Sequence, residues 1–104
     1  MNIIFFKSNV IFITEYLVAS YYLAGKFEEI DRLVSPKVNL SDIKSTMLGI
    51  YSYVLLDKNE KKEAKNILLK AIKKGLTRKM LVRLIGNKKV EIFVEKLKPL
   101  GSLD

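Results

Sequence analysis

The chain repeats its pattern of apolar residues after 34 positions, and this spacing limits the folds that it can adopt. When residues 16–38 are placed on residues 50–72, large apolar side chains coincide. The matched pairs are Tyr16 with Ile50, Leu17 with Tyr51, Tyr21 with Leu55, Tyr22 with Leu56, Ile30 with Ala64, Leu33 with Ile67 and Val34 with Leu68. A turn former recurs between the two halves of the pattern, as Gly25 and then as Asn59. A two-helix unit of this length predicts a stack of helical hairpins, an architecture that typically presents surfaces to partners.

Apolar residues at helical spacing, together with start and stop signals, predict six helices. The expected ranges are Val10–Ala24, Phe27–Val34, Asp42–Leu56, Glu60–Lys74, Arg78–Ile85 and Lys88–Leu97. Ser41 and Thr77 are suitable N-caps for the third and fifth helices. Residues 10–76 then form two hairpin units, and residues 77–104 supply capping helices and a short tail. We expect Ala64 and Leu68 to lie in the core between these units.

The N-terminal residues 1–9 are apolar enough to require a separate test. A membrane helix needs about 20 apolar residues, and Lys7 interrupts this stretch. A secretory signal needs a basic start and a cleavage site of small residues, which the stretch lacks. We therefore expect a buried helix or extended segment that packs on the repeats, with a signal anchor as the alternative. On this basis we expect a cytoplasmic protein.

The composition restricts the chemistry that the chain can perform. Its 104 residues are 49% hydrophobic, enough for the core of one domain, and contain neither histidine nor cysteine. Disulfides, thiolate nucleophiles and the commonest general base and metal ligand are therefore excluded. The densest acidic cluster, Glu28, Glu29 and Asp31, is expected to be solvated charge. We expect no enzyme and no cofactor.

Positive charge is concentrated in the second half of the chain. Residues 1–56 hold five basic and five acidic residues, whereas residues 57–104 hold fourteen basic and six acidic ones. Such asymmetry indicates an anionic partner or, alternatively, lysine-rich solvated helix faces. The candidate anion-binding patch comprises Lys61, Lys62, Lys65, Lys70, Lys73, Lys74, Arg78 and Lys79.

Two segments resemble tetratricopeptide repeats. Tyr21–Ile30 has the family's turn, in which aromatics end one helix, glycine follows, and an aromatic and acidic residues open the next. Asn59–Lys74 resembles the second helix of a unit, with Ala64 and Ala71 at the family's small positions. The resemblance implies an all-α fold of antiparallel hairpins stacked as a short right-handed α-solenoid. It also implies a concave groove for a peptide or partner helix, lined by Glu15, Ala19, Tyr22, Leu23, Gly49, Tyr53, Asp57 and Arg83.

These observations predict a non-catalytic protein-protein interaction module, such as an adaptor, scaffold or chaperone-like protein. Its partner is expected to be a protein or peptide, and an acidic one suits the charge of the chain. RNA or DNA binding through the basic half is the alternative, and tyrosines that only pack on a neighbouring helix remain a second interpretation of the aromatic residues. Two units are few for a stack, so homo- or hetero-oligomerisation is a further hypothesis. We do not expect membrane binding.

Overall fold

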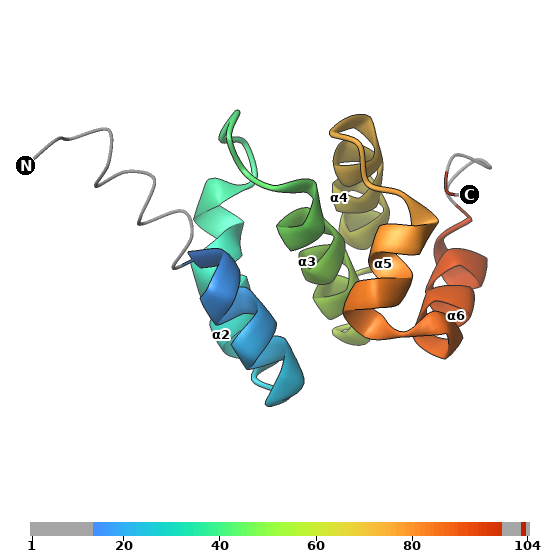
Figure 1. Cartoon of the computed structure of the whole chain (residues 1–104), viewed down its shortest axis with the longest axis horizontal. Helices are drawn as coiled ribbons and strands as arrows, with labels where there is room; N and C mark the ends of the chain where they lie inside the picture. Colours follow the sequence, from blue (N-terminus) through green and yellow to red (C-terminus); the bar gives the residue numbers. More distant parts are fainter. Residues whose placement is uncertain (1–13, 99–102, 104) are drawn as a thin grey trace, which may run out of the picture.

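The computed structural model describes residues 14–98 and residue 103, and within them the chain is all-α (Figure 1). Six helices and one 3₁₀ turn follow one another without a strand in the described residues. They are the N-terminal helix (residues 14–23), α2 (Phe27–Val34), η1 (Ser35–Lys37), α3 (Ser45–Asp57), α4 (Lys61–Lys73), α5 (Arg78–Ile85) and α6 (Asn87–Leu97). The all-α class is confirmed, while the right-handed path of a solenoid stays a prediction. The expected N-terminal segment 1–9 and the expected start of the first helix lie outside the described residues.

The 34-residue echo in the sequence corresponds to a turn that recurs in the backbone. Gly25 and Asn59 both have left-handed conformations, with φ of 71° and 64°. The hydrogen bonds also match, from Lys26 N–H to the Tyr21 carbonyl at 2.8 Å and from Glu60 N–H to the Leu55 carbonyl at 2.9 Å. Glycine adopts positive φ without strain and asparagine tolerates it. Both hairpins therefore turn from one helix into the next in the same way.

Local signals set the ends of several helices as expected. The Thr77 hydroxyl accepts a hydrogen bond from the Met80 N–H at 3.2 Å and caps α5. Gly86, with φ of 91°, separates α5 from α6. The bounds of α2 and α5 agree with the predicted ranges, because turn or capping residues flank both helices.

The predicted start of α3 was wrong by three residues. The helix begins at Ser45, and its N-cap is Lys44 in an extended conformation rather than Ser41. The reason is a contact from another part of the chain. Lys74 Nζ donates to the Ser41 carbonyl at 2.8 Å, and Lys70 Nζ donates to Asn39 Oδ1 at 2.6 Å. Lys70 of α4 and Lys74, the C-cap of α4, therefore hold the loop before α3 against the end of α4.

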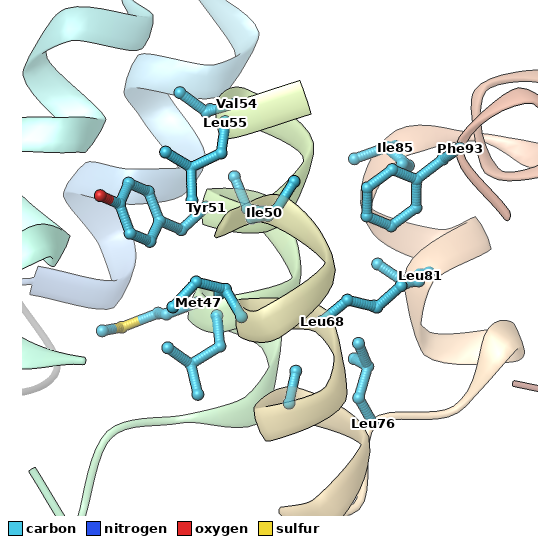
Figure 2. Close-up of a cluster of buried hydrophobic side chains, with 14 of the residues drawn as sticks. Met47, Ile50, Tyr51, Val54, Leu55, Leu68, Leu76, Leu81, Ile85 and Phe93 are labelled. Atoms are coloured by element: carbon cyan, nitrogen blue, oxygen red, sulfur yellow. The ribbon is translucent and has the colours of Figure 1, made fainter. Parts of the chain in front are cut away.

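The core runs continuously along an elongated molecule of 47 × 26 × 23 Å. Figure 2 shows α3 and α4 in its middle, with Met47 and Tyr51 of α3 pointing to one side and Leu81 of α5 lying on the other. Ala64 and Leu68 are fully buried, as the apolar pattern predicts. The α3–α4 contact also contains a buried polar group, Ser52, whose Oγ donates to the Ala64 carbonyl at 2.5 Å.

Leu103 is buried in the core cluster. Among the described residues, no helix has both the length and the apolar content needed to cross a bilayer.

Candidate functional site

Four aromatic side chains from four helices meet around the two tyrosines predicted to line a groove. Tyr22 stacks on Phe27, with ring centroids 6.0 Å apart and planes 13° from parallel. Tyr53 of α3 meets Tyr22 edge-on at 6.0 Å, and Phe93 of α6 meets Tyr53 at 5.9 Å. Aromatic rings favour such offset and edge contacts, which add about 0.5–1.5 kcal/mol per pair beyond burial. We call Tyr22, Phe27, Tyr53 and Phe93 the aromatic cluster.

Lys89 of α6 closes the edge of the aromatic cluster. Its ammonium donates to Tyr22 Oη at 3.1 Å and lies 5.2 Å and 5.7 Å from the ring centroids of Tyr22 and Tyr53. The hydrogen bond with Tyr22 raises the pKa of Lys89, and burial raises the pKa of Tyr53. Phe93 is fully buried beside them. Tyr22 and Tyr53 are therefore half-buried, and both contact side chains of α6.

Neither Lys89 nor Phe93 was singled out from the sequence. Lys89 lies 67 positions from Tyr22, and no local spacing reports a contact over that distance. The alternation of apolar and charged residues along α6 identifies Phe93 as a core residue, without indicating which helix it touches.

Gly49 does not line a free surface, contrary to the expectation from the resemblance. It is buried within α3, and a Cβ at this position would come within 3.0 Å of Leu76 Cδ2 and 3.1 Å of Leu81 Cδ2. Glycine is present because the residues that lead into and form α5 approach the α3 backbone closely. A partner has no access to this residue in the structure.

The remaining predicted groove residues vary in exposure. Glu15 is half-buried, whereas Ala19, Leu23, Asp57 and Arg83 are exposed.

The N-terminal helix has an exposed apolar face that the sequence pattern only partly identified. Tyr16 is 73% exposed and Leu23 is 84% exposed, with the exposed Ala19 between them. Residues three, four and seven positions apart lie on one side of a helix. We call these three residues the N-terminal apolar face. Tyr16 was matched to Ile50, which is 4% exposed, so the same pattern position is covered in one unit and open in the other.

The residues of the predicted anion-binding patch differ in their exposure and contacts. Lys70 and Lys74 bind the loop before α3, and Lys65 and Arg78 are half-buried. The exposed remainder is Lys61, Lys62, Lys73 and Lys79. Two of these open α4 and the other two lie at the end of α4 and in α5.

The acidic cluster of α2 was expected to be solvated charge, but two of its three residues contact side chains outside α2. Asp31 accepts a 2.7 Å hydrogen bond from Tyr51 Oη, and Lys58 approaches Asp31 at 3.2 Å and Glu28 at 2.8 Å. The Tyr51 hydrogen bond, with help from Lys58, lowers the pKa of Asp31 despite an opposing effect of burial. Only Glu29 makes a purely local pair, with Arg32 at 2.7 Å. The cluster joins two hairpins and is a structural feature.

Within residues 14–98 and 103, no group of three or more acidic side chains is arranged to hold a metal ion. Comparison with known proteins found no matching family model, no similar curated protein and no similar solved structure.

Proposed function

We propose that the chain is a non-catalytic protein-interaction module, a tetratricopeptide-like array of hairpins that binds a partner helix on its N-terminal apolar face. The observation that carries this proposal is the exposure of Tyr16 and Leu23, at 73% and 84%, on one side of a single helix. The other large apolar residues of the N-terminal helix, such as Val18, are buried or half-buried.

The size of these side chains supports a binding role. Burying an exposed large apolar side chain contributes roughly 1.5–3 kcal/mol. Tyrosine is also enriched among the residues that dominate interface energies. Tyr16 and Leu23 contribute little of this energy to the fold of the described chain, so it is available to a partner.

The pattern of the face indicates a helical occupant. Apolar residues at i, i+3 and i+7 form the stripe by which one amphipathic helix packs against another. Ala19 and Leu23 belong to the groove set implied by the resemblance, while Tyr22 and Tyr53 are half-buried and contact Lys89 and Phe93. The proposed surface therefore shares Ala19 and Leu23 with the expected groove. It is centred on the exposed side of the N-terminal helix and not on Tyr22 and Tyr53.

A designed peptide tests the proposal. The probe is a fluorescein-labelled amphipathic helix with leucine in an i, i+3, i+7 pattern and with glutamine and alanine elsewhere. Titration is followed by anisotropy at protein concentrations where light scattering gives the mass of one chain. We expect binding that the double variant Tyr16→Gln/Leu23→Gln weakens at least tenfold.

Ile92→Gln is the matched control, because Ile92 is a 48% exposed apolar residue on another helix, α6. We expect this variant to bind the peptide like the wild type. A peptide in which serine replaces leucine controls for non-specific binding. Equal binding by the wild type and the double variant would refute the proposal.

A second candidate function is binding of RNA or DNA through the basic half. It is supported by the fourteen basic residues against six acidic ones in residues 57–104. Contacts with phosphates make affinity fall steeply with salt. The test measures a labelled single strand at two salt concentrations, with Lys73→Glu/Lys79→Glu as the variant, since this choice spares the structural Lys70 and Lys74. Affinity that is insensitive to salt and to charge reversal would exclude it.

A further inference from the structure

We propose that the helix that covers the N-terminal apolar face is the same helix of a second copy of this chain, packed antiparallel across a two-fold axis. This inference rests on the proposed function, because it names the partner that the exposed face takes. It commits to a symmetric homodimer with Ala19 at the crossing point.

The order of residues on the face is self-complementary. Tyr16 and Leu23 lie three positions before and four positions after Ala19. Running the second helix in the opposite direction places Tyr16 of one copy against Leu23 of the other, on both sides of the axis. A two-fold interface requires this reciprocity, in which the same surface serves both subunits.

The small residue at the centre permits close approach. Helix axes pack 8–10 Å apart depending on the side chains at the contact, and alanine favours the shorter distance. The large residues on either side of the alanine can then pack against those of the second helix, next to the crossing point. Tyr16 and Leu23 with Ala19 between them give this large-small-large profile.

The distribution of charge favours a second copy on this side of the molecule. The chain has a net charge of +8, so two copies repel each other over most of their surfaces. Residues 1–56, which include the N-terminal helix, hold five basic and five acidic residues. Contact through the neutral half keeps the two basic halves apart, whereas an acidic partner would be drawn to residues 57–104.

The interface is small, and this sets the expected behaviour. A single helix pair buries less than the ~1,200–2,000 Å² of a standard stable interface. The dimer should therefore form and dissociate within the concentration range of light scattering. The mass should rise from that of one chain, 11.9 kDa, towards twice this value as concentration increases.

Cysteine cross-linking tests the geometry directly, because the chain contains no cysteine of its own. A disulfide requires Cα atoms about 4.4–6.8 Å apart, which closely packed antiparallel helices reach at and next to their crossing point. Ala19→Cys should give a covalent dimer under mild oxidation. A mixture of Tyr16→Cys and Leu23→Cys chains should cross-link with each other, while either alone should do so much less.

Ile92→Cys is the control for random collision, since it places a thiol on an exposed apolar position of α6. It should cross-link at least tenfold more slowly than Ala19→Cys. In a parallel measurement, Leu23→Glu should hold the mass at that of one chain at every concentration. Circular dichroism verifies that this variant keeps its helix content.

The outcomes separate the two proposals. A chain that stays monomeric, or that cross-links equally at positions 19 and 92, overturns the homodimer. If such a chain still binds the leucine peptide through Tyr16 and Leu23, the proposed function stands without it. If it binds neither peptide nor a second copy, both fail. A dimer that persists in Leu23→Glu also overturns the inference, because it uses another surface.

Discussion

The hydroxyl of Tyr51 on α3 donates a 2.7 Å hydrogen bond to the carboxylate of Asp31 on α2, and so joins the first hairpin to the second. Lys58, just after α3, adds ion pairs to Asp31 and Glu28 at 3.2 Å and 2.8 Å. The matched position in the first unit is Leu17, which has no hydroxyl. This polar connection therefore belongs to the junction between units and is not part of the repeat itself.

Removing the Tyr51 hydroxyl should lower stability without disturbing the packing of the ring. We expect Tyr51→Phe to reduce the free energy of unfolding by about 0.5–1.5 kcal/mol, the net value of one hydrogen bond. Urea unfolding followed by circular dichroism measures it. Tyr16→Phe is the control, because its side chain is 73% exposed, and it should change stability by a few tenths at most. Equal losses in the two variants would contradict the role of this bond.

Acid should weaken the same junction. The Tyr51 hydrogen bond lowers the pKa of Asp31 in the folded state, so the ionised carboxylate stabilises the fold. This contribution is present above the ordinary pKa of 3.8 and is lost as pH falls through the lowered value. The difference in the free energy of unfolding between the wild type and Asp31→Asn should therefore shrink as the pH falls from about 6 to about 2. This range spans the pKa of a free aspartate, roughly 3.9. A constant difference in urea midpoint across that range would argue against it.

Alkaline titration should show Tyr51 as a late-ionising tyrosine. Burial, followed by the bond to Asp31, raises its pKa from 10.0 to about 12. The neutral phenol is favoured in the folded protein, so its stabilising contribution is complete below 10 and is lost as pH rises towards 12. The ultraviolet absorbance of the phenolate follows the titration. Tyr51→Phe should remove one tyrosine ionisation from the high-pH end of the titration curve. Loss of an ionisation near pH 10 instead would disprove the assignment.

The close contact at Gly49 makes a structural prediction. Gly49→Val should destabilise the protein by about 1–3 kcal/mol, because the added carbons meet Leu76 and Leu81. Thermal or urea unfolding measures the change. Lys62→Val introduces the same side chain at an exposed position of α4 and should cost much less. Wild-type stability in Gly49→Val would show that α5 does not pack against α3 as described.

Lys89 should fasten α6 to the N-terminal helix. We expect Lys89→Ala to lower stability by about 0.5–1 kcal/mol, the range for a cation near an aromatic face at an exposed site. In Lys89→Ala, amide hydrogen exchange should become faster in α6 than in the wild type, with a smaller change in α3. Lys96→Ala, an exposed lysine on the same helix, serves as the control. If both variants behave alike, the contact with Tyr22 contributes nothing to stability.

Local features of the sequence predicted most of the helices. Gly25 defines the start of α2, and Thr77 and Gly86 define α5, because their effects act within a few residues. The start of α3 was missed, since Lys74 holds the Ser41 carbonyl across 33 positions. No pattern of neighbouring residues contains that information.

The candidate site was predictable only in part for the same reason. Ala19 and Leu23 follow from their place on a helix, and both are exposed. Tyr22 and Tyr53 do come together, but they also contact Lys89 and Phe93 of α6 and are half-buried. Whether a helix face is free depends on elements that are distant in sequence, as Gly49 also illustrates.

The matching backbone at Gly25 and Asn59 makes the fold modular for engineering. Because both bends have similar φ angles and matching hydrogen bonds, the ends of a segment cut at the two bends should fit each other. Duplicating that segment would insert a complete extra unit and lengthen the molecule, and deleting it would shorten the molecule by one. The number of hairpins could thus be changed by gene construction without designing a new loop.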